Sequence, residues 1–108
     1  MRSGAMICLL YVPFPSDRDY VSWCRSLVSR GLAASINAVQ AKSFFFWENQ
    51  LNQTDEIILI MKTSKEKAEA LKKAVEAEHP YQVPAIIEIP VVDVNAPYLS
   101  WVRESTTP

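Results

Sequence analysis

Glycine and histidine are scarce in this sequence, and each shortage excludes a class of protein. Only two glycines and one histidine occur among its 108 residues. Two glycines are too few for a Walker A loop or a dinucleotide fingerprint, and one histidine excludes a multi-histidine zinc site within a single chain. No serine, histidine and aspartate stand in a recognisable nucleophile motif. The sequence therefore argues against the most common classes of enzyme.

Cysteine is also rare, with Cys8 and Cys24 as the only two. They are too few and too far apart for a disulfide framework or a CxxC metal pair. Both are interpreted as small hydrophobic core residues. A reducing compartment, and hence a cytoplasmic location, is the expectation.

Long apolar runs and excess charge are absent as well. No run approaches the roughly 20 residues of a membrane span, and Ile7 to Val12 is too short for a signal peptide. A net charge of -1 indicates neither a nucleic acid nor an anionic membrane as partner. We expect one domain over residues 1–108, with Met6 as a candidate natural start and residues 1–5 as a disordered or added leader.

The first half of the chain predicts a strand, a helix and a long strand. Met6 to Val12 is almost continuously apolar, as a strand buried on both faces would be, and prolines follow it. Ser16 is the expected N-cap of a helix whose apolar stripe ends before Gly31. Leu32 to Trp47 then alternates and ends in aromatic residues, which favours a strand.

The second half predicts a strand, a helix, an edge strand and a short helix. Polar residues 48–55 are expected to form a hairpin turn, followed by a strand over Glu56 to Lys62. Thr63 and Glu66 have the spacing of a capping box that begins a helix ending at His79 and Pro80. A proline-bounded strand is expected over Val83 to Val91. Asn95 is the expected cap of the last helix.

This order predicts an α+β fold, the ferredoxin-like split βαβ sandwich (βαββαβ plus a short C-terminal helix). Both long helices would cover one face of the sheet. Met6 to Val12 and Glu56 to Lys62 are nevertheless apolar on both faces, and no residues remain to cover the second one. Phe44 to Phe46 must also point in alternate directions, so at least one ring faces away from its own core. A second copy of the chain is the expected cover, so we predict a symmetric oligomer.

Several spaced residues are together similar to the CutA family of divalent-ion tolerance proteins, over Met6 to about Arg103. They are Leu32-Ala33-Ala34, Trp47-Glu48, Glu56, Lys62-Thr63, His79-Pro80-Tyr81-Gln82-Val83-Pro84 and Tyr98-Leu99-Ser100-Trp101. The resemblance implies a tightly packed homotrimer of ferredoxin-like subunits, a link to copper and other divalent ions, and a likeness to PII signalling proteins, which bind ligands between subunits. Two cysteines common in the family are replaced here by Val12 and Ser35, and a turn glycine by Asn49, so copper binding of the thiolate kind is not expected.

The candidate site residues each have a structural alternative. Glu56 and His79 are candidate metal ligands, but Glu56 can equally be an ion-pair partner, and His79 can simply finish a helix. Lys62 is a candidate anion ligand or a solvated strand end. The aromatic side chains are candidate ligand contacts in a cleft, although such residues are more often packing residues; they are Trp47, Tyr81, Tyr98 and Trp101.

The expected function is a non-enzymatic homotrimer that responds to divalent metal ions, with a ligand or metal held at clefts between subunits. No cofactor is required, and binding of copper or zinc should be weak. The alternative is a PII-like regulator that senses a small anionic metabolite. An enzyme that uses His79 and Glu56 as acid and base is the third hypothesis, and it would need a concave pocket around them.

Overall fold

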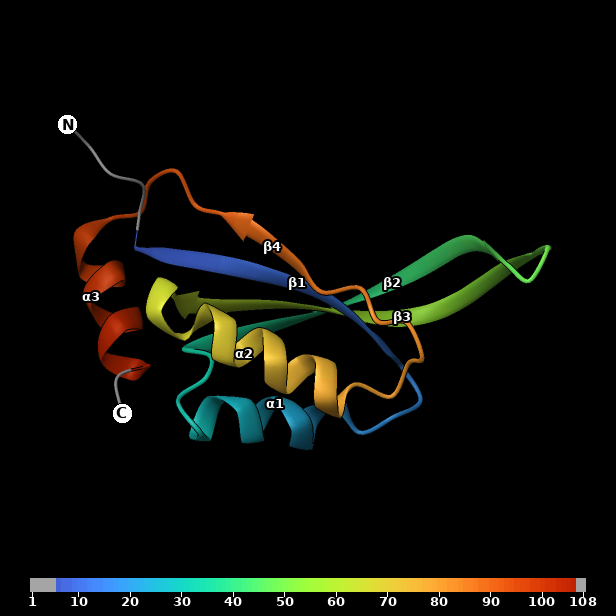
Figure 1. The fold of residues 1–108 in the computed structure, drawn as a ribbon, viewed down its shortest axis with the longest axis horizontal. Coiled ribbons are helices and arrows are strands. Elements are labelled where there is room, and N and C mark those ends of the chain that lie inside the picture. Colours follow the sequence, from blue (N-terminus) through green and yellow to red (C-terminus); the bar gives the residue numbers. More distant parts are fainter. Residues whose placement is uncertain (1–5, 107–108) are drawn as a thin grey trace.

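The computed structural model describes residues 6–106, so the expected leader at 1–5 lies outside the described residues. The elements follow in the predicted order along the chain (Figure 1). They are β1 (Ile7–Pro15), α1 (Tyr20–Ser29), β2 (Ser35–Trp47), β3 (Gln50–Ser64), α2 (Lys65–Glu78), β4 (Ile87–Pro90) and α3 (Ala96–Ser105). The strands form one antiparallel sheet in the order β2-β3-β1-β4. The ferredoxin-like arrangement predicted from the sequence is therefore confirmed for the single chain.

Helices α1 and α2 lie together against one face of the sheet (Figure 1). Alternate residues of β1 and β3 point to this face and pack against Leu27 of α1 and Leu71 and Val75 of α2. The strand residues of this core are Leu10, Val12, Phe14, Ile57, Leu59 and Met61. Their burial makes this layer the main source of stability for the chain.

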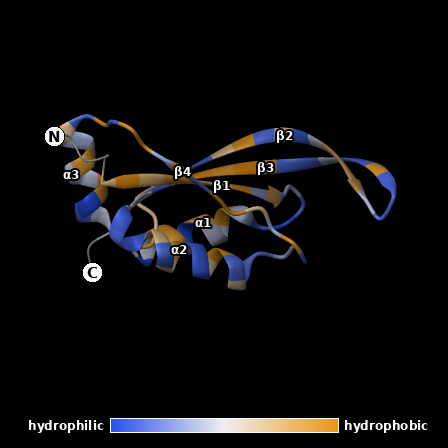
Figure 2. Ribbon diagram, turned by 45° about the horizontal axis from the view of Figure 1, so that its top comes forward, coloured by the Kyte–Doolittle hydropathy of each residue, from blue (hydrophilic) through white to orange (hydrophobic). Residues whose placement is uncertain are grey.

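The opposite face of the sheet is covered only at one end, where α3 packs. Ile7, Ala34 and Val102 form a second small core there. The expectation that no residues remain for this face is therefore wrong at this end, because α3 turns back over the start of β1 (Figure 1). Further along the same face, Val39 and Ile87 remain 49% and 50% exposed. Figure 2 shows the apolar character that continues along the central strands.

Strands β2 and β3 continue past the end of β1 as a two-stranded arm, defined here as residues 42–55 (Figure 1). Its turn contains only Glu48 and Asn49, both with positive φ, of 52° and 65°. The expected polar loop over 48–55 and the strand start at Glu56 are wrong, because this tight turn lets pairing resume at Gln50. Asn49 does keep the turn's backbone, as expected from its tolerance of positive φ.

The N-termini of α1 and α2 lie one to three residues after their predicted positions, whereas Asn95 is the N-cap of α3 as predicted. Asp19, rather than Ser16, caps α1, and its Oδ1 accepts a hydrogen bond from the Ser22 amide at 3.0 Å. The capping box of Thr63 is also absent: Ser64 is the N-cap of α2, and the Thr63 hydroxyl donates to the Leu32 carbonyl at 2.7 Å. Thr63 lies in β3 instead, and its hydroxyl bonds with a carbonyl distant in sequence rather than with a backbone N–H of α2.

The prolines of the edge and central strands also act differently from the prediction. Strand β1 continues through Pro13 to Pro15 instead of ending before them. Because β4 pairs with β1 only as far as Tyr11, no second strand requires the backbone N–H groups that these prolines lack. Strand β4 is only Ile87–Pro90, shorter than the predicted Val83 to Val91. The segment before it, with Pro84, is irregular. No helix within residues 6–106 has the length and apolar character to cross a membrane.

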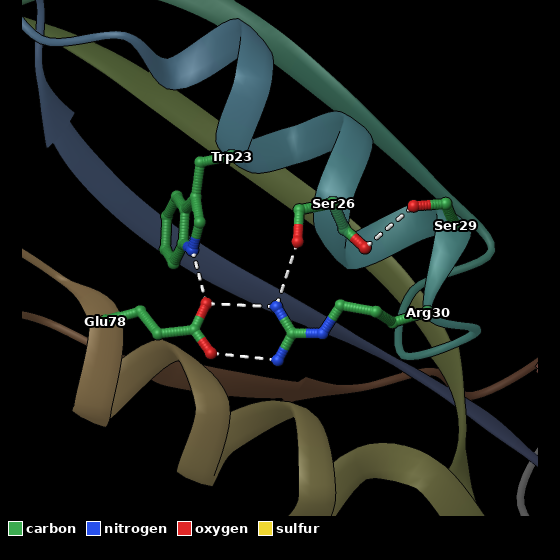
Figure 3. Close-up of polar contacts among 5 residues, drawn as sticks. All are labelled: Trp23, Ser26, Ser29, Arg30 and Glu78. Carbon is green, nitrogen blue, oxygen red and sulfur yellow. Dashed lines mark hydrogen bonds and ion pairs between the residues drawn. The ribbon is translucent and has the colours of Figure 1, made fainter.

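A polar contact ties α1 to α2 on the outside of the core (Figure 3). Glu78 of α2 accepts hydrogen bonds from both terminal nitrogens of Arg30, at 3.1 and 2.8 Å, and from the indole of Trp23 at 2.9 Å. Trp23 in turn stacks on Phe14, with 4.9 Å between ring centroids. These contacts hold the C-terminus of α2, which His79 caps, against the end of β1.

The buried helix face can be tested with two matched valine substitutions. Val75→Ala in α2 removes two buried methyl groups and should lower the free energy of unfolding by about 1–3 kcal/mol. Val28→Ala in α1, at an exposed helical position, makes the same change in helix propensity and serves as control. Urea unfolding measures both. Equal effects of the two substitutions would show that the helix layer is not the core.

Candidate functional site

Glu56 is a buried carboxylate at the point where the arm leaves the three-stranded part of the sheet. It pairs with Pro15, the last residue of β1, and is only 7% exposed. The Tyr81 hydroxyl donates to its Oε2 at 2.6 Å, and the Ser43 hydroxyl donates to its Oε1. Burial, together with the Glu56 and Asp17 carboxylates, raises the pKa of Tyr81. The phenol therefore stays protonated and acts as a hydrogen-bond donor.

His79 ends α2 and uses both ring nitrogens within the chain. Its backbone N–H donates to the Val75 carbonyl at 2.9 Å, which completes the helix. Its Nε2 lies 2.7 Å from the Pro13 carbonyl, and its Nδ1 accepts from the Tyr81 amide at 3.1 Å. This pattern requires the neutral tautomer with the proton on Nε2. A metal at His79 would have to displace one of these two hydrogen bonds.

Three aromatic rings surround the His79 imidazole. Its ring centroid lies 5.2 Å from that of Phe14, 6.0 Å from that of Trp23 and 4.8 Å from that of Tyr81. Burial lowers the pKa of His79, and the Pro13 carbonyl and the Glu56 carboxylate only partly oppose this. The neutral imidazole therefore serves chiefly to join α2, β1 and the segment after α2.

A groove with a volume of about 780 Å³ lies beside this cluster, between the base of the arm and the segment that follows α2. Trp47 and Phe45 of β2 line it together with Glu56 of β3 and Tyr81. Three of the sequence-predicted site residues, Trp47, Glu56 and Tyr81, are therefore brought together. His79 is not among the lining residues, but its ring contacts that of Tyr81.

The remaining predicted site residues lie at the other end of the sheet. Lys62 donates a hydrogen bond to the side chain of Asn37, and burial lowers its pKa. The Tyr98 hydroxyl lies 3.4 Å from the Ser35 hydroxyl, and its ring centroid is 5.6 Å from that of Trp101. Glu56 and Lys62 are six residues apart on one strand, a distance of about 20 Å. One chain therefore does not combine them into a single small-molecule site.

The described residues do not form a metal site within one chain. Within residues 6–106, no group of three or more His, Cys, Asp or Glu side chains is arranged to hold an ion. Val12 is fully buried in the helix-covered core, opposite Leu59, whereas Ser35 pairs with Lys62 near α3. Their partners on β3, Leu59 and Lys62, are three residues apart, which is about 10 Å along the strand. Cysteines at these two positions could not share an ion within a single chain either.

The sequence reasoning missed Ser43 and the Pro13 carbonyl as partners of the predicted residues. The alternation of β2 and the register of the arm place Ser43 on the same face as Glu56. A two-residue turn at Glu48 and Asn49 would have predicted this register. No sequence signal identifies the Pro13 carbonyl, because a backbone acceptor carries no residue preference.

The geometry therefore defines a small ferredoxin-like α+β protein with a carboxylate–tyrosine cluster beside an aromatic groove. The sequence model of the family described as "CutA1 divalent ion tolerance protein" matches residues 8–105, and the chain belongs to this family. It is 36% identical to the divalent-cation tolerance protein CutA of Pyrococcus horikoshii over 91% of this chain and 96% of that protein. It is 39% identical to a CutA homologue of Xenopus laevis over 87% of this chain but only 63% of that longer protein.

The fold is also that of solved CutA structures. The crystal structure of CutA1 from Pyrococcus horikoshii aligns with 95% of this chain and 100% of that one, at a TM-score of 0.88 and 35% identity. A Nostoc protein described as the PII-like protein CutA aligns with 93% of this chain and 97% of that one, at a TM-score of 0.87 and 24% identity, which shows a shared fold alone. The family is named for tolerance of divalent ions and not for a reaction.

The neutral state of His79 makes the stability of the chain depend on pH. In the unfolded chain the imidazole has its ordinary pKa of about 6.5, whereas burial lowers it in the folded chain. The unfolded chain therefore binds more protons below about pH 6.5, and the free energy of unfolding should fall as the pH falls from there through the folded-state pKa.

Urea unfolding at a series of pH values between about 8 and 5 measures this loss. His79→Gln, which has no titrating group at this position, should show a flatter pH profile over the same window. An unchanged pH dependence in His79→Gln would mean that other groups cause the effect.

Proposed function

We propose that the chain forms a homotrimer that takes part in the response to divalent metal ions without catalysing a reaction. The family to which it belongs, named for divalent-ion tolerance, supports the role. The proposal includes weak binding of a ligand or a metal such as copper or zinc at clefts between subunits. Several chains must contribute ligands, because one chain offers a single imidazole and, within residues 6–106, no cluster of metal-binding side chains.

The exposed apolar surface of the single chain is the observation that carries the oligomer. The arm exposes Phe44, Phe46 and Leu51, at 66%, 73% and 71%. The sheet exposes Val39, Ile87 and Ile89 on the face that α3 leaves uncovered. An isolated two-stranded arm is only marginally stable in water, so it needs a partner surface. A second copy of the same chain supplies apolar surface of matching extent.

A PII-like regulator that senses a small anion is the alternative function. The observation that favours it is Lys62, whose burial and contact with Asn37 give a partly desolvated ammonium group. Lys62 pairs in the sheet with Ser35, whose hydroxyl lies 3.4 Å from that of Tyr98. An ordered anion at Lys62 would support this alternative over a metal response.

We further propose a cytoplasmic location. Its support is the pair of free cysteines, Cys8 and Cys24, in a chain that shows no disulfide within residues 6–106.

A trimer that does not dissociate readily is expected from this surface. Sedimentation at micromolar concentration should show one trimeric species, since interfaces of this obligate kind commonly bury about 2,000 Å² or more.

Ile58→Asp and Ile60→Asp each place an unpaired carboxylate on the face of β3 opposite the helices, which should cost several kcal/mol and disrupt assembly.

Lys73→Asp on the exposed face of α2 is the control and should be nearly neutral, because the nearby Glu69 pairs with Lys72, at 3.3 Å. A well-folded native monomer under these conditions would contradict the oligomer. Soluble trimers of unchanged stability in both isoleucine variants would contradict the role of this face.

Binding of zinc or copper(II) should be weak and should depend on His79. The imidazole must give up a hydrogen bond to Pro13 or Tyr81 to bind an ion, and it must be unprotonated. Affinity should therefore fall as the pH drops through the folded-state pKa of His79, which burial holds below its ordinary value. Calorimetric titration of the native protein and of His79→Ala measures this dependence. Tight copper(I) binding that survives His79→Ala, or that is lost in Cys8→Ser, would show that the ligands are different ones.

A further inference from the structure

Two oxidisable side chains near the end of β1 each donate a hydrogen bond to a carboxylate. The Tyr81 hydroxyl donates to Glu56 Oε2 at 2.6 Å. The Trp23 indole N–H donates to Glu78 Oε1 at 2.9 Å (Figure 3). Phenol and indole can each lose a single electron, and the oxidised ring then becomes strongly acidic. A carboxylate within hydrogen-bond distance is a base in position for the proton that such an oxidation releases.

The His79 imidazole connects the two oxidisable rings. Its ring centroid lies 4.8 Å from that of Tyr81 and 6.0 Å from that of Trp23, and both distances are in the range of ring contacts. The imidazole is held by the Pro13 carbonyl and the Tyr81 amide, and the residue is only 8% exposed. Electron transfer slows steeply with distance, so a continuous series of ring contacts favours it. Tyr81 and Trp23 are therefore placed to exchange an electron within one chain.

The surroundings of the two carboxylates decide which ring keeps the oxidised state. Arg30 forms an ion pair with Glu78 and lowers the pKa of this carboxyl group, which makes it a poor acceptor for the indole proton. Glu56 is buried and accepts its hydrogen bonds from neutral hydroxyl groups.

Oxidation therefore has opposite electrostatic effects at the two rings. If Tyr81 loses an electron and its proton moves to Glu56, a buried negative charge is neutralised. If Trp23 loses an electron, a positive charge appears beside the ion pair of Glu78 and Arg30, which is neutral as a whole. The oxidised state is therefore more stable on Tyr81 than on Trp23.

We infer that Trp23, His79 and Tyr81 form a radical relay from the outside of the helix layer to Tyr81. A one-electron oxidant, such as a hydroxyl or azidyl radical, takes an electron from the half-buried Trp23 indole and is itself reduced. One electron then moves from Tyr81 to the Trp23 radical cation and restores the indole. The phenolic O–H bond breaks as its proton forms a new O–H bond at Glu56 Oε2.

The products of this step are a neutral tyrosyl radical and a neutral carboxylic acid, and no proton leaves the protein. The relay goes beyond the proposed response to divalent ions, and it requires no bound metal.

Pulse radiolysis in azide solution, with a chelator to remove metal ions, tests the relay. The azidyl radical oxidises indole in preference to phenol and becomes azide. The chain has three tryptophans, so Trp47→Phe and Trp101→Phe are combined to leave Trp23 as the only indole. The absorbance of the indolyl radical should decay while that of the phenoxyl radical rises, at a rate independent of protein concentration. A rate proportional to protein concentration would show transfer between molecules and overturn the inference.

Two tyrosine variants identify the residue that receives the oxidised state. Tyr81→Phe removes one hydroxyl group, and it should abolish the rise of the phenoxyl signal and prolong the Trp23 radical. Tyr20→Phe is the matched control, because Tyr20 lies three residues before Trp23 on α1 and is the nearest tyrosine in sequence. The same pair is measured in the chain that keeps all three tryptophans, where the relay supplies part of the signal. Unchanged transfer in Tyr81→Phe, or its loss in Tyr20→Phe, would overturn the inference.

The proton acceptor is tested with two glutamate variants. Glu56→Gln replaces the base with an amide of similar shape and should slow the transfer about a hundredfold, as removal of a general base commonly does. Glu76→Gln makes the same change at an exposed position of α2 and should leave the rate unchanged. Transfer should also be slower in deuterium oxide, because the phenolic O–H bond breaks in this step. Equal rates in Glu56→Gln and Glu76→Gln would overturn the inference.

Discussion

The antiparallel pairing of β1 with β3, from Ile7 opposite Ser64 to Pro15 opposite Glu56, supports every other part of the structure. Both strands are central in the sheet, and their side chains on the helix side form the main core with α1 and α2. Their side chains on the other face are largely apolar too, yet the chain supplies only α3, which reaches one end. This imbalance between apolar surface and available cover is the physical basis of the proposed assembly.

The length of β3 separates two chemically different regions of the molecule. One end carries Glu56, held by Ser43 and Tyr81 beside the aromatic groove. The other carries Lys62 near α3, about 20 Å away. A carboxylate favours a metal cation, and a partly desolvated ammonium group favours an anion, so the two proposed ligand chemistries belong to different ends of one face. Only contact between chains could bring such ends together.

Part of the candidate site could be predicted from the sequence. The family resemblance and the residue types selected Glu56, His79, Tyr81 and Trp47, which the structure places around or beside one groove. The same reasoning grouped Lys62, Tyr98 and Trp101 with them, whereas in one chain Tyr98 and Trp101 belong to α3 and Lys62 lies at the end of the sheet where α3 packs. Shared motifs do not give distances in space; the six residues of β3 between Glu56 and Lys62, and the packing of α3 at one end of the sheet, separate the two groups.

The sequence by itself determined the order of strands and helices and their buried stripes, because periodicity and side-chain type act locally along the chain. Only the tertiary structure decided where those elements begin and end. Thr63 does not cap α2 but bonds with the Leu32 carbonyl, and the turn at Asn49 lets β3 begin six residues before the predicted start at Glu56. It also decided that His79 uses both ring nitrogens on Pro13 and Tyr81. In each case a side chain can form a hydrogen bond with a neighbour in sequence or with a group distant in sequence. The distant group comes within reach only when the chain folds, so the sequence alone does not identify it.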